Sequence, residues 1–198
     1  MQVWALSLAV CAAAVTFSFV RIDVPTALRF WNASRLLRPL NEGLGSAVIL
    51  SAESAVILFI VVVRLTTGHI SVFGQTLAIA CLASMCTYVI NDHVLKVIFG
   101  VPTPADVMHG ARHRFHLWIG SEASSFPSGH MALAGAFAGV FMRLYKASIW
   151  PLAALLALAA GLLLVGDWHF LSDIIAGVFV GISAGTLAGE GWADHSKH

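Results

Sequence analysis

The stretch IWPLAALLALAAGLLLV, residues Ile149–Val165, contains no charged side chain, although Lys146 precedes it and Asp167 follows it. A long apolar run with charges only outside it is typical of a helix that spans a lipid bilayer. The composition agrees, because 59% of the 198 residues are hydrophobic and only 11% are charged. A soluble domain carries about a quarter charged residues, so this composition excludes a fully water-facing surface.

Five further apolar runs have a similar length. The six expected spans cover residues 3–20, 46–63, 73–90, 127–144, 149–165 and 173–189. The first run follows no basic segment, so we expect a retained span rather than a cleaved signal peptide. Short links between most spans predict an all-α, polytopic membrane protein: six transmembrane helices in one bundle, forming a single domain over residues 1–198.

Glycines recur at every fourth residue in two of the runs. They are Gly177, Gly181, Gly185 and Gly189 in the last run, and Gly135 and Gly139 in the fourth. Small residues at this spacing let two helix backbones approach closely. We expect these glycines to pack helices rather than to form a site.

The link over residues 21–45 mixes apolar side chains with four arginines. These are Arg21, Arg29, Arg35 and Arg38. The mixture predicts an amphipathic helix at the lipid surface, with its basic side near phosphate headgroups. An ordinary connecting loop is the alternative. The net charge of +1 gives no reason to expect nucleic acid as a partner, so membrane lipids are the expected partners.

Because consecutive spans cross the membrane in alternating directions, polar residues from distant parts of the chain come to one membrane face. With six spans, the third span ends where the fourth begins, and the fifth ends where the sixth begins. Those ends carry Lys96, residues 128–130 and residues 169–173. The topology alone therefore predicts a site at this face.

The sequence Pro-Ser-Gly-His at residues 127–130 has the features of an anion cradle. Pro127 suits the first turn of a helix, where its missing N–H is harmless. The Ser128 hydroxyl and the free N–H groups of residues 128–130 then point at an anion, and Gly129 allows close approach. His130 can give a proton to a leaving alkoxide. A proline-started helix with a chance histidine is the alternative.

His169 and Asp173 are four residues apart. On a helix they share one face, so the carboxylate can hold one imidazole nitrogen and leave the other as a nucleophile. A structural ion pair at a helix end is the alternative. Lys96, just beyond the third span, is by itself typical of an interfacial anchor, and its proposed role depends on sharing a face with the other residues.

These motifs together resemble the type-2 phosphatidic acid phosphatase superfamily, which shares its active-site architecture with vanadium haloperoxidases, and in particular a bacterial branch of it. The resemblance rests on Lys96 with Pro104, on the Pro-Ser-Gly-His sequence and on His169 with Asp173. It implies a phosphatase without metal or other cofactor, acting on a lipid phosphate or a lipid or isoprenyl diphosphate. It also implies that His169 forms a phosphohistidine oriented by Asp173, that His130 is the acid and base, and that Lys96, Ser128 and Gly129 bind phosphate oxygens.

Three positions depart from the family pattern. Thr103 stands where an arginine precedes Pro104, Leu162 and Leu163 stand where Ser-Arg is expected, and Val101 occupies a position where arginine is frequent. Arginine forks clamp phosphate oxygens well, so their loss needs a replacement. Arg112 and Arg114 in the loop before the Pro-Ser-Gly-His sequence are the expected replacements. The alternative is a catalytically degenerate protein that binds lipid phosphates.

The same loop carries His109, His113 and His116. Their spacing permits a zinc site, but the intervening arginines repel a cation, so contact with headgroups or phosphate is the preferred interpretation. The cysteines Cys11, Cys81 and Cys86 lie in apolar runs and match no zinc or disulfide pattern. Glu53 is a costly carboxyl inside the second run, either paired or protonated.

The orientation in the membrane is ambiguous from the sequence. Basic residues are more numerous on the site face, which by the positive-inside rule favours the cytoplasm. Several of those residues are also candidate phosphate ligands, and without them the rule is silent. The resemblance implies an extracytoplasmic site, so the expectation is a bacterial inner membrane protein with its site facing the periplasm.

Overall fold

The computed structural model describes residues 2–34 and 45–195, and these residues form helices and connecting segments with no β-strand. The long helices are α1 (Gln2–Arg21), α2 (Asp23–Ser34), α4 (Ser46–Thr67), α5 (Val72–Ile90), α8 (Gly129–Leu144), α9 (Ile149–Val165) and α10 (Leu171–His195). The short ones are η1 (Asn91–Leu95), α6 (Lys96–Phe99), α7 (Pro104–Met108) and η2 (Lys146–Ser148). The predicted all-α, polytopic architecture is confirmed.

Five segments of the described chain are long and apolar enough to cross a membrane. They are Trp4–Arg21, Ser46–Thr67, Val72–Met108, Lys146–Val165 and Leu171–His195. The fourth expected span is α8, which has only 16 residues and is therefore about 24 Å long. It lies at the centre of the bundle, where its neighbours rather than lipid cover most of its surface, so it needs less length than a lipid-facing helix.

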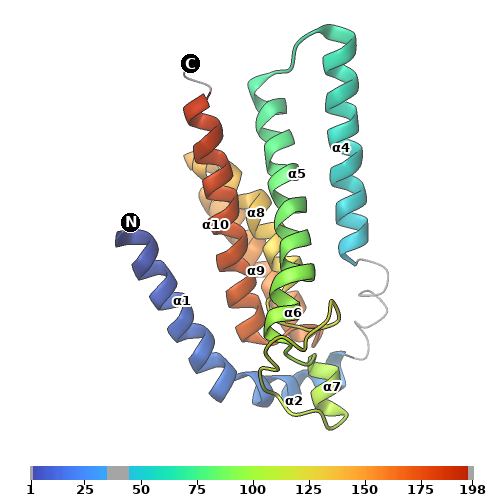
Figure 1. Cartoon of the computed structure of the whole chain (residues 1–198), viewed down its shortest axis with the longest axis vertical. Helices are drawn as coiled ribbons and strands as arrows, with labels where there is room; N and C mark the ends of the chain where they lie inside the picture. Colours follow the sequence, from blue (N-terminus) through green and yellow to red (C-terminus); the bar gives the residue numbers. More distant parts are fainter. Residues whose placement is uncertain (1, 35–44, 196–198) are drawn as a thin grey trace.

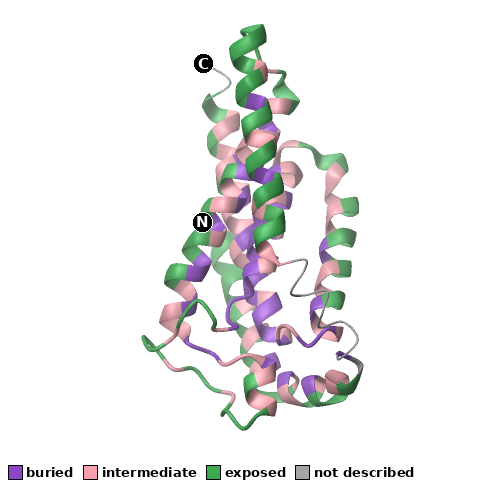
Figure 2. Ribbon diagram, turned by 90° about the vertical axis from the view of Figure 1, so that its right-hand side faces the viewer, coloured by how far each residue is buried: buried purple, intermediate pink, exposed green. Residues whose placement is uncertain are grey.

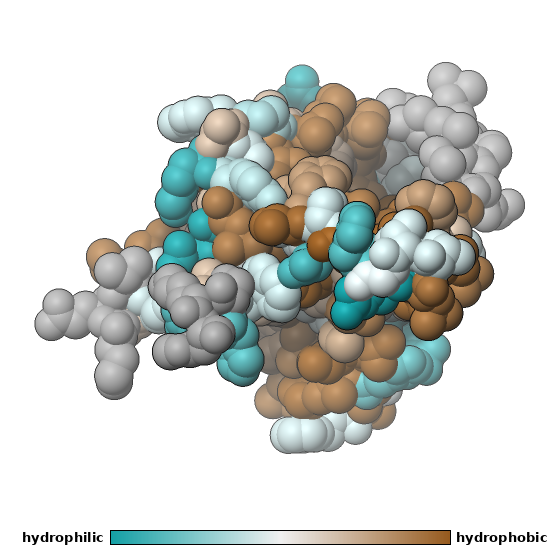
Figure 3. All heavy atoms as spheres, turned by 90° about the horizontal axis from the view of Figure 1, so that it is seen from above, coloured by the Kyte–Doolittle hydropathy of each residue, from teal (hydrophilic) through white to brown (hydrophobic). Residues whose placement is uncertain are grey.

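The helices α5, α8, α9 and α10 stand side by side, while α1 and α4 occupy the two edges (Figure 1). Large apolar side chains are exposed along the flanks, among them Leu6, Leu58, Leu65, Trp150 and Leu158. Such a surface suits contact with lipid tails. Viewed onto the end that lies away from α2, hydrophilic residues are interspersed with hydrophobic ones (Figure 3). Exposed apolar flanks on long helices identify an integral membrane protein.

The most extensive helix contact joins α8 to α10. The glycines produce it: a Cβ added at Gly135 would meet the Gly181 Cα at 3.3 Å, and one added at Gly139 would meet the Gly185 Cα at 3.2 Å. The predicted packing role of these glycines is confirmed. Buried residues accordingly gather along the centre of the bundle and toward its lower end (Figure 2).

The helix α2 lies across the lower end of the bundle (Figure 1). It confirms that residues 23–34 of the first long link are helical rather than loop. Leu28 on this helix is exposed, whereas Asp23 and Ala27 are buried. Arg35 and Arg38, which belonged to the predicted basic side, lie outside the described residues, so the contact with lipid headgroups stays a prediction.

At the end of α5 the helix widens into a single π-helical turn before α6 begins. Such turns are rare and are found frequently at functional sites. Here the turn places Asn91, Asp92 and Lys96 inside the lower end of the bundle, where all three are buried. Gly100 then ends α6 in the left-handed conformation, with φ 58°, and the chain leaves the bundle for the long loop.

Candidate active site

The start of α8 and the start of α10 are joined by a main-chain hydrogen bond. The Ser128 N–H donates to the Asp173 carbonyl at 3.0 Å. The Ser128 hydroxyl caps α8 by accepting the Met131 N–H at 3.4 Å. The prediction of a free Ser128 N–H for an anion is therefore wrong, because α10 takes this donor. Gly129 and His130 lie in the first turn of α8, where N–H groups have no partner within the helix.

His169 lies just before α10, which begins at Leu171, two residues earlier than the expected span over residues 173–189. The Asp173 carboxylate reaches back and accepts the Phe170 N–H at 2.9 Å, as an acidic side chain in the first turn of a helix commonly does. This contact fixes the start of α10 after His169. The predicted pairing nevertheless forms, since His169 Nδ1 lies 3.5 Å from Asp173 Oδ2.

The two candidate catalytic histidines face each other. The ring centroids of His130 and His169 are 5.8 Å apart, and the ring planes are inclined by 67°. Asp173 is completely buried, and no hydrogen-bond partner reaches His130 Nε2, His169 Nδ1 or Asp173 Oδ1 in the described part of the chain. Buried polar atoms usually have protein partners, so a cluster of such atoms around two facing histidines is typical of a functional site.

Lys96 is a buried lysine with a carboxylate partner. Its Nζ lies 2.8 Å from Asp92 Oδ1 and donates to the Glu122 carbonyl at 3.2 Å. The sequence interpretation as a snorkelling anchor does not apply, because the side chain is only 11% exposed. The analysis of the sequence missed Asp92, although its spacing of four residues from Lys96 is a usual signal for an ion pair.

Asp92 also brings Lys96 to the cradle. A Cβ added to Gly129 would meet Asp92 Oδ1 at 3.0 Å and the Tyr88 ring at 3.2 Å. The Asn91 side-chain amide donates to the Pro127 carbonyl at 3.0 Å, which ties the π-helical turn to the start of α8. The structure thus brings together Lys96, Ser128, Gly129, His130, His169 and Asp173 from three separate segments.

A second buried carboxylate, that of Asp23, accepts hydrogen bonds from the start of α10. Asp23 at the start of α2 accepts the Ser172 N–H at 3.1 Å, the Ser172 hydroxyl at 2.5 Å and the Ser18 hydroxyl at 2.9 Å. Burial raises the pKa of Asp23 above its usual range, while its serine hydrogen bonds act in the opposite direction. Nothing in the sequence near residue 23 pointed to Ser172, 149 residues away.

His113 packs beside Asp23 and contacts the same part of the structure. Its ring stacks on Phe19 with centroids 4.1 Å apart and lies 4.3 Å from the Phe170 ring. Its Nε2 is 3.5 Å from Asp23 Oδ2. Burial lowers the pKa of His113, and the nearby carboxylates of Asp23 and Asp173 raise it by less. The loop histidine therefore helps to hold α1 and α2 against the segment that carries His169.

The three histidines of the long loop lie in separate surroundings. His109 makes an edge contact with Trp31, and His116 Nδ1 lies 3.1 Å from the Gly100 carbonyl. No three potential metal ligands cluster in residues 2–34 and 45–195.

The two loop arginines are exposed. Arg114 Nε donates to His116 Nε2 at 3.0 Å. Within the described residues we find no hydrogen bond or ion pair from Arg112 or Arg114 to His130, His169 or Lys96. Their role as phosphate ligands stays a prediction.

The positions that lack the expected arginines have other structural roles. Thr103 caps α7, and its hydroxyl donates to the Asp106 carboxylate at 2.7 Å. Leu163 is buried in the core, and Leu162 is exposed on the flank. None of these three positions carries an arginine.

A comparison with protein families matches this arrangement. The sequence model of the PAP2 superfamily covers residues 76–192, more than half of the chain. The chain belongs to the PAP2 superfamily. Membership indicates a phosphatase that acts on lipid phosphates. The match contains every candidate site residue and leaves α1, α2 and α4 outside. Searches of curated proteins and of solved structures each gave no significant match.

Proposed function

We propose that this PAP2 protein hydrolyses a lipid phosphate, or a lipid or isoprenyl diphosphate, through a phosphohistidine on His169 and without a metal. The observation that carries the proposal is the pair of facing histidines, of which His169 has the buried Asp173 beside it. A carboxylate beside one imidazole nitrogen sets the tautomer and stabilises the imidazolium that forms. The whole chain, residues 1–198, forms one membrane phosphatase domain around this pair.

The first step transfers the phosphoryl group. Since Nδ1 of His169 faces Asp173, Nε2 attacks phosphorus and forms the N–P bond. The bond from phosphorus to the lipid oxygen breaks, and His130 donates its proton to that oxygen. The lipid alcohol, or the lipid monophosphate from a diphosphate, then leaves.

The second step reverses the role of His130. It takes a proton from water, the water oxygen attacks phosphorus, and the N–P bond breaks to release inorganic phosphate and free His169. Lys96, the Ser128 hydroxyl and the Gly129 N–H bind the oxygens that do not transfer, and Arg112 and Arg114 add positive charge from the loop. Removing one such donor costs roughly 10²- to 10³-fold in rate in other enzymes.

We place this site at the periplasmic face of a bacterial inner membrane. The position of the site at one end of a bundle with apolar flanks supports a site at a membrane surface, and the choice of the periplasmic face rests on the family resemblance alone. Candidate substrates are phosphatidic acid, phosphatidylglycerol phosphate, an isoprenyl diphosphate and a phosphorylated lipid A.

Phosphate release from these lipids in detergent, with EDTA present, tests the proposal. We expect release that persists under chelation and is lost in His169→Ala. The control is His69→Ala, since His69 is exposed in the turn between α4 and α5 at the other end of the bundle. Full activity in His169→Ala, or activity that EDTA abolishes, would overturn the mechanism.

The second candidate function is a non-catalytic lipid-phosphate binder. The observation that favours it is the absence of guanidinium groups at positions 103, 162 and 163, where a cap and two leucines stand. Binding of the same lipids without release of phosphate from any of them would support the binder. Conversely, a fall in turnover in both Arg112→Gln and Arg114→Gln would assign the missing charge to the loop and support the enzyme.

A further inference from the structure

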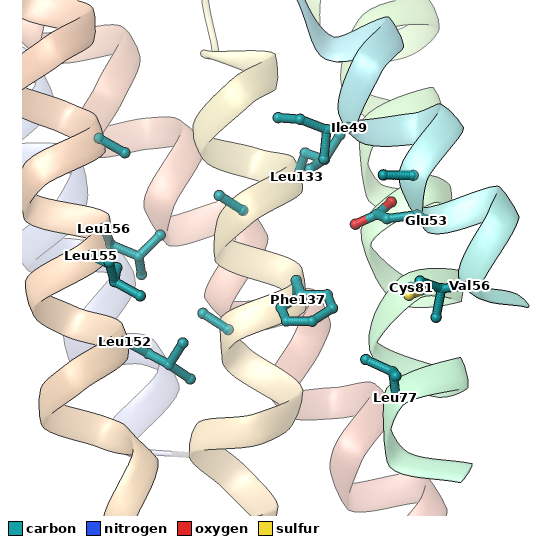
Figure 4. Close-up of a pocket in the computed structure, with 14 residues that line it drawn as sticks. Ile49, Glu53, Val56, Leu77, Cys81, Leu133, Phe137, Leu152, Leu155 and Leu156 are labelled. Atoms are coloured by element: carbon teal, nitrogen blue, oxygen red, sulfur yellow. The ribbon is translucent and has the colours of Figure 1, made fainter. Parts of the chain in front are cut away.

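A largely apolar cavity of about 460 Å³ lies inside the membrane-spanning part of the bundle. Side chains of α4, α5, α8 and α9 line it, and Glu53 of α4 contributes a carboxyl group (Figure 4). The volume lies within the range of small-molecule pockets. Leu133, Phe137 and Ile49 are typical of the remaining lining. An almost wholly apolar wall suits a hydrocarbon chain, whereas a carboxyl group does not.

Glu53 is buried in this wall, and one of its two carboxyl oxygens lacks a partner. It is 7% exposed, and its Oε2 makes no hydrogen bond with any described residue. The hydroxyl of Ser84 lies beside it, but this hydroxyl donates its proton to the Leu133 carbonyl at 3.0 Å. A serine has one proton to donate, so Ser84 cannot also donate to Glu53, and its contact with the carboxyl leaves Oε2 unsatisfied. Polar groups at this depth are costly unless they are used.

The cavity begins close to the phosphate cradle. Leu133 follows His130 by three residues on α8, so one helical turn separates the cavity from the proposed acid. On α4, the Ser46 hydroxyl exchanges a hydrogen bond with the Tyr88 hydroxyl at 2.7 Å, and the Tyr88 ring lies against Gly129. Glu53 is seven residues further along α4, which puts it roughly 10 Å beyond the cradle.

We propose that the cavity takes the tail of the lipid phosphate and that Glu53 binds a hydroxyl or amide group on that tail. The inference rests on the proposed function, because the phosphate group at the cradle fixes where the tail begins. A carboxyl group exchanges hydrogen bonds with either of these groups. The preferred substrate class is therefore a lipid phosphate whose tail carries a hydrogen-bonding group roughly 10 Å from phosphorus.

A matched pair of lipids tests the inference: a saturated monoalkyl phosphate and its derivative of the same length with a mid-chain hydroxyl. Hydrolysis and binding of both are measured in parallel. We expect a roughly tenfold preference of the wild type for the hydroxylated lipid, in kcat/KM and in affinity. Glu53→Leu should reduce this ratio to about one, while Glu53→Gln, which can still exchange a hydrogen bond, should keep most of it.

The control variant is Ser54→Leu, because Ser54 lies on the same turn of α4 but is exposed outside the cavity. It should keep the preference of the wild type. Equal treatment of the two lipids by a wild type that hydrolyses both would overturn the inference and leave the proposed function intact. Selective binding of the hydroxylated lipid without hydrolysis of either lipid would support the inference and overturn the proposed function. A preference unchanged in Glu53→Leu would remove Glu53 from the account.

Discussion

The Ser128 N–H donates a hydrogen bond to the Asp173 carbonyl at 3.0 Å. This bond joins the residue that begins the phosphate cradle to the residue that faces His169. Gly177, one turn further along α10, makes the approach possible, because a Cβ there would meet the Ser128 carbonyl oxygen at 2.5 Å. The geometry between cradle and nucleophile is therefore set by the packing of α8 on α10.

Gly177→Ala should disturb this geometry. The added methyl group meets backbone rather than a flexible side chain, so we expect a loss of about 1–3 kcal/mol in stability, as for other overpacked cores, together with lower phosphatase activity. Thermal unfolding in detergent and phosphate release measure the two effects. The control is Gly191→Ala on the same helix, where a Cβ meets nothing within 4 Å. Equal behaviour of the two variants would contradict the packing argument.

Asp173→Asn should abolish most of the turnover while leaving the protein folded. The amide oxygen can still accept the Phe170 N–H, so the start of α10 is retained. The amide cannot stabilise a charged His169, and a comparable change in a serine protease triad lowers kcat by roughly 10⁴-fold. We expect a fall of roughly 10²- to 10⁴-fold in kcat with a small change in KM. A variant with near-normal kcat would show that Asp173 has only a structural role.

Lys96→Met should lower kcat/KM by roughly 10²- to 10³-fold, since it removes a donor to the phosphoryl oxygens. It also leaves Asp92 without its partner at 2.8 Å, so a loss of stability accompanies the kinetic effect. Lys96→Arg keeps the charge and should retain more of both. Lys146→Met, at an exposed lysine between α8 and α9, is the control and should behave as wild type. Normal kinetics in Lys96→Met would remove this residue from the site.

The buried His113 should make stability depend on pH. Burial lowers its pKa below the value of the unfolded chain, about 6.5. A histidine whose pKa is lower in the folded than in the unfolded protein contributes stability above its unfolded pKa. This contribution is lost as the pH falls through the pKa of the folded protein. The melting temperature should therefore fall between about pH 7 and pH 5 by more in the wild type than in His113→Phe.

His113→Phe keeps an aromatic ring between Phe19 and Phe170, and it removes both the titration and the contact of Nε2 with Asp23. Asp23 and Asp173, the acidic groups that face His113, remain in both proteins. The raised pKa of Asp23 makes stability depend on pH in the opposite direction, since the contribution of Asp23 to stability is present at low pH and is lost as the pH rises. A constant difference in melting temperature across this range would exclude His113 as the titrating group.

Much of the fold could be predicted from the sequence, because bilayer length and hydropathy constrain where spans begin and end. The expected spans over residues 73–90 and 149–165 coincide with α5 and α9 almost to the residue. Parity then brought Lys96, His130 and His169 to one end, where the structure also has them. Both inferences depend on local patterns that a single sequence displays.

The missed features depend on tertiary contacts. Asp23 contacts Ser172 across 149 residues, and no local pattern announces such a contact. The Ser128 N–H was expected to be free because its partner, the Asp173 carbonyl, belongs to another segment. The spacing of His169 and Asp173 did not show where α10 begins, because its start depends on the contact of the Asp173 carboxylate with the Phe170 N–H. Only Asp92 could have been found, from its spacing to Lys96.

The most direct test of the account is to trap the intermediate on His169. Wild type and His130→Ala are mixed with a lipid phosphate that the wild type hydrolyses, quenched rapidly at alkaline pH, digested and analysed by mass spectrometry. The account predicts phosphate on His169 in the wild type and none in His169→Ala, and in His130→Ala both slower formation and slower loss of the phosphohistidine, because both steps lack the proton transfer of His130. Phosphate on another residue, or undiminished hydrolysis by His169→Ala, would contradict it.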